Sequence, residues 1–151
     1  MKRKIQMSYM KFFGMFRRRK DSSETVETIE NMKLTLRGMR GSYMYIFDSV
    51  NGQSELRRYV EKYCGEETNL ILEASVLYNE QKMIDLMNTC SVISWDGFHG
   101  KHPKNVQDGI MFDFSAKVNG GRTVLADGSA NFPKGYSEFV RTLDEILVKA
   151  N

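Results

Sequence analysis

The residues best suited to catalysis or metal binding lie in one polar segment, residues 95–102, with the sequence WDGFHGKH. This segment contains both histidines of the chain, His99 and His102, and Asp96, and Asp108 follows shortly after. Histidine and carboxylate groups bind zinc, and a histidine oriented by an acid can transfer protons. A small metal-dependent hydrolase built on these four residues is therefore one hypothesis. Two histidines three residues apart in a loop do not fix two ligands, however, so we predict no metal and no other cofactor.

The other acidic residues and glycines favour structural roles. Asp96, Asp108 and Asp127 each precede a glycine, a pair that is typical of turns. The sequence has no GxSxG motif, and the glycines at 119–121 are not followed by the helix that a phosphate-binding loop requires. These observations favour binding over catalysis.

The first 20 residues carry an excess of positive charge. They contain eight Lys or Arg residues and no acid, whereas the rest of the chain has 14 basic and 19 acidic residues and a net charge of −5. A basic helix with an apolar stripe suits a membrane surface or the groove of a partner protein. Helical spacing places one such stripe on Ile5, Tyr9, Phe12, Phe13 and Phe16. We predict that the arm makes its contact through Lys4, Phe12, Phe13, Phe16, Arg17 and Arg18.

The sequence indicates a cytoplasmic protein. No stretch approaches the roughly 18 apolar residues of a membrane span, and the uncharged runs on either side of Lys11 are shorter than the core of a signal peptide. The basic arm leaves open that the protein also binds peripherally to a membrane. Cys64 and Cys90 lie 26 residues apart without a CxxC motif, which favours two reduced thiols, although the sequence does not decide whether they pair.

Tyrosines in the first predicted hairpin are further candidate contacts. Tyr43 and Tyr45 could bind a peptide or stack on single-stranded bases if they lie on an exposed sheet face. The acidic charge of the chain beyond the arm disfavours nucleic acid, which is a third alternative. Trp95 and His99 complete the candidate binding residues, and a homodimer is left open.

Periodicity and turn residues predict the order of the elements. The Asn51-Gly52 pair and the glycines at 119–121 predict tight hairpin turns. Helical spacing predicts helices over residues 76–90, with Asn79 as the N-cap, and 136–149. A polar loop is expected over 98–107. Strands are expected over residues 32–39, 42–48, 55–63 (where a helix is the rival), 69–74, 91–95, 109–118 and 122–127.

This order indicates an α+β fold. Because the predicted strands come in adjacent hairpins, we expect a twisted antiparallel sheet built from hairpins, with two helices packed on one face. Residues 32–151 are expected to form a single domain, and residues 1–31 a basic amphipathic arm and linker.

Three stretches in the C-terminal half, WDGF, VQDGIMFDFSAKVNGG and ADGSANFPKGYSEF, resemble an uncharacterised family of small bacterial α+β domains. The resemblance runs over residues 32–147 and leaves the arm outside. It implies the fold class and no activity, so it assigns no functional residue. Its matching positions are Trp95, Gly128, Asn131, Pro133 and Tyr136, and Trp95 would anchor the core. The sequence as a whole favours a non-enzymatic binding or interaction module and leaves its ligand undetermined.

Overall fold

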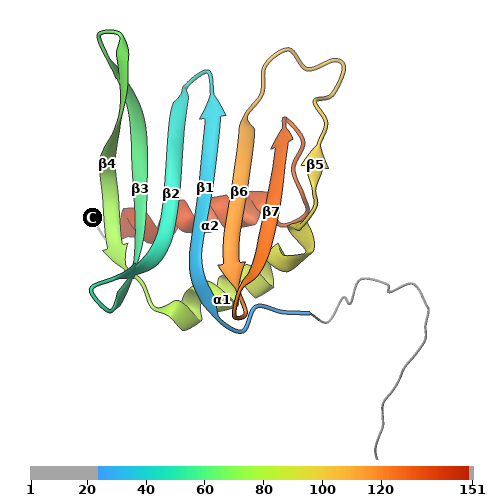
Figure 1. The fold of residues 1–151 in the computed structure, drawn as a ribbon. Coiled ribbons are helices and arrows are strands. Elements are labelled where there is room, and N and C mark those ends of the chain that lie inside the picture. Colours follow the sequence, from blue (N-terminus) through green and yellow to red (C-terminus); the bar gives the residue numbers. More distant parts are fainter. Residues whose placement is uncertain (1–23, 150–151) are drawn as a thin grey trace, which may run out of the picture.

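A computed structural model describes residues 24–149 and shows one mixed sheet with two α-helices behind it (Figure 1). The sheet has seven strands in the order β4-β3-β2-β1-β6-β7-β5. All neighbours are antiparallel except β5 and β7, which are parallel. The strands are β1 (Ile29–Gly38), β2 (Gly41–Val50), β3 (Gln53–Cys64), β4 (Glu67–Leu77), β5 (His99–Gly100), β6 (Met111–Val118) and β7 (Arg122–Ser129).

The α+β class is confirmed, but the expectation of a purely antiparallel sheet is wrong at one edge. The two residues of β5 lie in the segment expected to be a polar loop, and they pair with Asp127 and Gly128 of β7. Glycine is required here because a Cβ on either Gly100 or Gly128 would collide with the carbonyl of Asn131. Because both residues are glycines, the carbonyl of Asn131 can lie close to β5 and β7. Hydrophobic periodicity could not indicate this pairing.

Two of the three helical segments follow their sequence signals. α1 spans Glu80–Thr89, and the side chain of Asn79 accepts a hydrogen bond from the backbone of Lys82, as expected for an N-cap. The expected start at residue 76 is too early, because β4 continues to Leu77. α2 spans Tyr136–Lys149, as predicted.

The third helical segment corrects a prediction. Residues 91–95 were expected to form a strand, but Val92–Trp95 form a 3₁₀ helix, η1. Ser91 adopts a left-handed backbone conformation that turns the chain out of α1. Val92, Ile93 and Trp95 are all buried, so a tight helical turn places three apolar side chains in the core at once.

The sheet begins before the expected boundary at Met32. β1 starts at Ile29, and Val26 is buried in the core. The side chain of Asn88 exchanges hydrogen bonds with the backbone of Val26, and Asn119 accepts from Glu27 and donates to Thr25. Residues 24–31, assigned to the linker from their polar composition, are therefore held against α1 and the β6–β7 turn.

The core lies between the helices and the sheet. Trp95 is 1% exposed and contacts the rings of Phe114, Tyr136 and Phe139 at centroid distances of 5.0, 6.1 and 5.5 Å. Its indole nitrogen donates to the carbonyl of Lys134 at 2.9 Å. Trp95 thus anchors η1 against β6 and α2, which agrees with the core position that the resemblance implies.

The sheet face opposite the helices is largely polar. Arg57, on β3, forms ion pairs there with Asp48 at 3.0 Å and Glu55 at 2.8 Å, and donates to the hydroxyl of Tyr59 at 3.1 Å. The hydrogen bond with Asp48 is the main factor that raises the pKa of Arg57. Arg57 therefore ties β2 and β3 together across this face, on which exposed apolar side chains are scattered.

The two cysteines are free, with Cys64 exposed at the end of β3 and Cys90 buried after α1. Burial raises the pKa of the Cys90 thiol from 9.0 to about 11, so it stays protonated at pH 8. We predict that a thiol reagent at that pH labels one cysteine quickly in the native protein and the second only after unfolding. Rapid labelling of two thiols would contradict this placement.

Candidate binding groove

The helices leave part of the sheet uncovered. In Figure 1, α1 lies behind the lower part of the sheet and α2 behind the middle, while the upper ends of the β1–β2 and β3–β4 hairpins extend beyond both. A cross-strand row runs through this region on the helix side, from Phe112 through Leu36, Tyr43 and Val60 to Ile71. Exposure increases along the row from Phe112, which is buried, to Ile71, which is 42% exposed.

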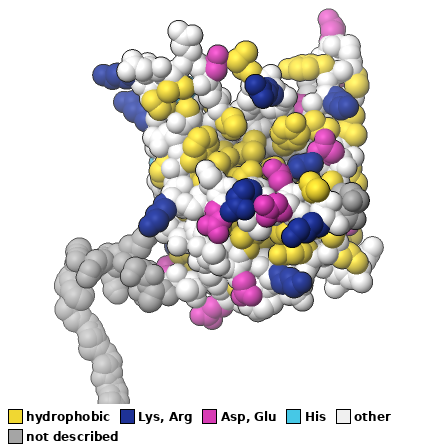
Figure 2. Space-filling view, turned by 180° about the vertical axis from the view of Figure 1, so that it is seen from behind, with side chains coloured by type: hydrophobic (Ala, Val, Ile, Leu, Met, Phe, Trp, Pro, Cys, Tyr) yellow, Lys and Arg dark blue, Asp and Glu magenta, His cyan; other side chains and the backbone are white. Residues whose placement is uncertain are grey.

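An apolar groove lies over this row, beside α2. Two adjoining cavities of about 590 and 650 Å³ share Leu36, Ile110, Val140 and Asp144, so they form one groove. Volumes of this size fall within the range of natural ligand sites. Figure 2 shows the hydrophobic side chains gathered on this face, next to a band of charged side chains. The sheet, α2 and the β1–β2 turn bound what we call the α2 groove.

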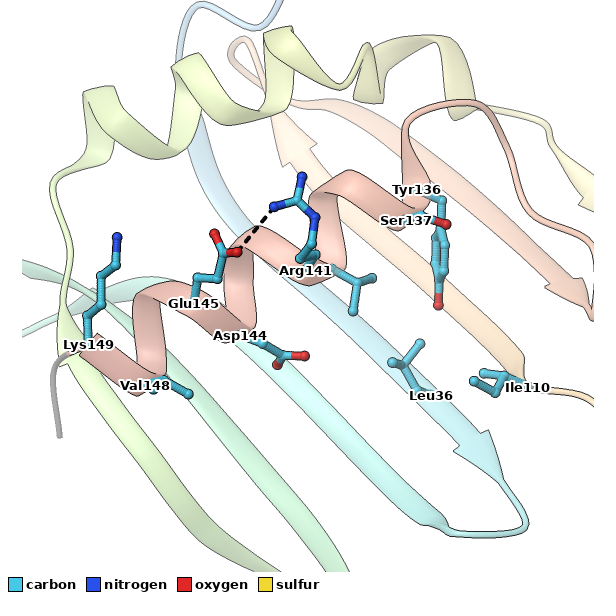
Figure 3. A pocket seen from close by; sticks show the side chains of 10 residues that line it. Leu36, Ile110, Tyr136, Ser137, Arg141, Asp144, Glu145, Val148 and Lys149 are labelled. Atoms are coloured by element: carbon cyan, nitrogen blue, oxygen red, sulfur yellow. Dashed lines mark hydrogen bonds and ion pairs between the residues drawn. The ribbon is translucent and has the colours of Figure 1, made fainter.

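The walls of the α2 groove come from segments far apart in the sequence. Tyr136, Val140 and Asp144 follow one another at four-residue intervals along α2 and form one wall. Leu36 of β1 and Ile110, which precedes β6, lie opposite the Tyr136 ring (Figure 3). Burial alone raises the pKa of the Tyr136 hydroxyl, so this group stays protonated and can donate a hydrogen bond at the end of the groove.

A polar cluster fixes α2 against the sheet at the other end. Asp144 accepts hydrogen bonds from the hydroxyl of Tyr45 and the guanidinium of Arg58, both at 2.7 Å. Arg58 also pairs with Glu73 at 2.7 Å and lies over the Tyr43 ring, 5.9 Å from its centroid. Strands β2, β3 and β4 and helix α2 thus meet through one carboxylate and one guanidinium.

The contacts of this cluster are structural, because its polar groups bind one another. Desolvation, followed by the hydrogen bond to Asp144, raises the pKa of Tyr45, so its hydroxyl is a donor rather than a base. Asp144 already accepts two hydrogen bonds, which leaves it poorly suited to remove a proton from a substrate. The geometry favours binding over catalysis.

We predict that Asp144→Ala lowers the free energy of unfolding by about 1–2 kcal/mol, because it removes the acceptor of two partly buried donors. The matched control is Glu145→Ala, one residue along α2. It breaks only the exposed pair with Arg141 at 3.2 Å, for which the expected loss is about 0–0.5 kcal/mol. Urea unfolding of the two variants measures the difference, and equal losses would refute this role for Asp144.

The aromatic residues considered as contacts lie on the helix side of the sheet or in the core. Tyr43 and Tyr45 were candidates only if they lay on an exposed sheet face, and both point to the helix side. Tyr45 is 3% exposed and Trp95 1% exposed, so both are core residues. Tyr43 is half-buried and lines the α2 groove, which makes it the member of this set that is placed to touch a ligand.

The four residues of the hydrolase hypothesis contact different partners. His99 pairs with Asp127 at 3.1 Å, and His102 contacts the hydroxyl of Ser129 at 2.7 Å. Asp96 accepts from the backbone of Leu125 at 3.0 Å, while Asp108 lines the α2 groove. Within residues 24–149, no three His, Cys, Asp or Glu side chains are grouped so that they could hold a metal ion.

The candidate residues of the arm, Lys4, Phe12, Phe13, Phe16, Arg17 and Arg18, lie outside the described residues. In the part of the chain that is described, no helix has the length and apolar character needed to cross a membrane.

Sequence reasoning missed most of the groove residues. Leu36 and Val140 were expected only as apolar positions of a strand and a helix, and Asp144 and Arg58 carried no motif. The available signal was an acid within the amphipathic α2 and an arginine on the apolar side of β3. A charged residue on an apolar face indicates a buried partner.

Compared with known proteins, the chain matches no family model, no curated protein and no solved structure.

Proposed function

We propose that this protein is a non-enzymatic binding module that takes an amphipathic helix of a partner protein in the α2 groove. The observation that carries the proposal is the uncovered apolar row beside α2, with Leu36 and Tyr43 as its floor and Val140 as its wall. An apolar surface of this kind is stabilised when another element covers it.

The shape of the groove favours a helix as the ligand. Lining residues occur along the whole of α2, from Tyr136 to Lys149, which at 1.5 Å per residue gives a groove of roughly 20 Å. A helix lying beside α2 would extend the layer formed by α1 and α2 over the upper part of the sheet. Its apolar side chains at positions i, i+3, i+4 and i+7 would pack on the groove floor.

The rim of the α2 groove carries charged side chains, which would form a polar border around the bound helix. Arg141, Glu145 and Lys149 lie along the outer edge of α2, and Arg40 and Asp108 near the β1–β2 turn. Charges of both signs at the rim match the polar border of protein–protein interfaces and favour a partner helix with mixed charges on its polar face. The hydroxyl of Tyr136 adds a directional donor.

Selection from a phage-displayed library of helix-length random peptides tests the proposal. With the full chain as target, selected peptides should share apolar residues at helical spacing. They should bind Val140→Asp about tenfold or more weakly than the native protein, because the substitution places a carboxylate on the groove wall. The matched control is Leu125→Asp on the opposite sheet face, which should leave binding unchanged. Peptides without helical periodicity, or equal binding to both variants, would refute the proposal.

The other expectations drawn from the sequence stay proposals. The basic residues 1–20 are proposed as a separate contact for a partner protein, with an anionic membrane surface as the alternative. Relationship to the small bacterial α+β domains and a cytoplasmic location are proposed on the sequence alone.

A further inference from the structure

The outer edge of the sheet at β4 is long and unpaired among the described residues. β4 has 11 residues, and those from 67 to 73 are all exposed. Leu70, Ile71 and Leu72 are 51%, 42% and 50% exposed, and they present apolar surface on both faces of the sheet. Protein edges usually carry lysine or proline that blocks a further strand, and β4 contains neither of them and no arginine.

We infer that two copies of this chain pair antiparallel through residues 69–73 of β4, with Ile71 opposite the partner's Ile71. This inference does not depend on the proposed function, because it concerns a different surface. The pairing would join the two seven-stranded sheets into one.

Register favours a second copy of the same strand as the occupant. With Ile71 on the two-fold axis, Leu70 lies opposite the partner's Leu72, and Asn69 lies opposite the partner's Glu73. Apolar side chains then meet apolar ones, and the carboxylates of Glu67 and Glu73 do not face each other. Moving the axis to Leu70 or Leu72 places Ile71 opposite the partner's Asn69 or the partner's Glu73. A one-residue slip would bring side chains from opposite faces together.

The local geometry sets the length of the pairing. The register between β3 and β4 shifts between Arg58 and Tyr59, so Glu73 stands at a bulge and is held by Arg58. Beyond this bulge the alternation of faces changes, and regular pairing ends there. The interface is therefore short, and interfaces of small area form weak dimers that dissociate on dilution.

The pairing would also change the α2 groove. Its floor belongs to the row Leu36, Tyr43, Val60 and Ile71, which ends at the β4 edge. Because Ile71 would face the partner's Ile71, the rows of both copies would continue into each other. The two grooves would then share one apolar floor across the dimer.

Sedimentation velocity of the full chain over a range of micromolar concentrations tests the inference. We expect a monomer–dimer equilibrium that Ile71→Lys weakens by about tenfold or more, since two ammonium groups would meet at the axis. Leu125→Lys, at a leucine of β7 that is 54% exposed against 42% for Ile71, is the matched control and should dimerise like the native chain. Unchanged circular dichroism shows that each variant is folded. A monomer at every concentration, or equal effects of the two substitutions, would overturn the inference.

A crosslinking measurement tests the register itself. In a Cys64→Ser background, which removes the exposed native thiol, Ile71→Cys should form a disulfide-linked dimer under mild oxidation. Leu77→Cys, six residues along the same strand and beyond the bulge, should crosslink at least tenfold more slowly. Equal crosslinking at both positions would refute pairing centred on Ile71.

Discussion

Trp95→Ala is expected to lower the free energy of unfolding by about 3–5 kcal/mol, because Trp95 is among the largest fully buried side chains of the core. Truncation removes its contacts with Phe114 and Phe139 and leaves the carbonyl of Lys134 without its indole donor. Urea unfolding followed by far-ultraviolet circular dichroism measures the loss. Fluorescence is unsuitable, since the variant has no tryptophan.

Tyr63→Ala is the matched control for Trp95, because it removes an aromatic side chain that is 82% exposed. Its expected change is within about 0.5 kcal/mol. A Trp95→Ala variant as stable as this control would place Trp95 at the surface and contradict the core described above.

Gly135→Ala is expected to cost about 3 kcal/mol or more. Gly135 precedes α2 with a φ of +90°, a conformation that strains any residue with a side chain. A Cβ at this position would also collide with the carbonyl of Cys90, so the loop before α2 would have to move away from the end of α1. Strain and overpacking each contribute about 1–3 kcal/mol.

Gly120→Ala separates backbone strain from overpacking. Gly120 has a similar φ of +75°, but a Cβ there would have no atom within 4 Å. The expected cost is about 1 kcal/mol from backbone conformation alone. Thermal or urea unfolding of both variants gives the difference, and equal losses would refute the close approach between Gly135 and Cys90.

Features with a local cause could be predicted from the sequence. Asn51-Gly52 and Asn119-Gly120 form tight turns with positive φ, as their residue types indicate. The stripe of Phe139, Leu143 and Leu147 defines α2 because its period matches one buried helix face. The α+β class follows from these hairpins and helices.

Features with a non-local cause could not be predicted. Val92, Ile93 and Trp95 suit a strand or a helical turn equally well, and the left-handed backbone of Ser91 goes with the helical turn. The pairing of β5 depends on the approach of Gly100 to Gly128, which are 28 residues apart in sequence and carry no strand pattern. The contact of Val26 with the core likewise depends on Asn88, 62 residues away.

The α2 groove could not be predicted either, because it too depends on contacts between distant segments. The sequence indicates that Leu36 and Val140 are apolar, but not that the β1–β2 hairpin extends beyond α2 and leaves them partly uncovered. How much of the apolar row on the sheet is covered by α2 depends on where α2 crosses the sheet. Asp144, Tyr45 and Arg58 fix that crossing, and they come together from sequence separations of 86 and 99 residues.

Backbone amide spectra of the ¹⁵N-labelled full chain, recorded with and without a peptide selected on it, test the central claim most directly. The claim is that the α2 groove is the binding surface. We expect the largest shift changes at Leu36, Tyr43, Ile110 and Val140, with little change at Thr35 and Leu125 on the opposite sheet face. Largest changes on the opposite face, or at β5 around His99, would contradict the account.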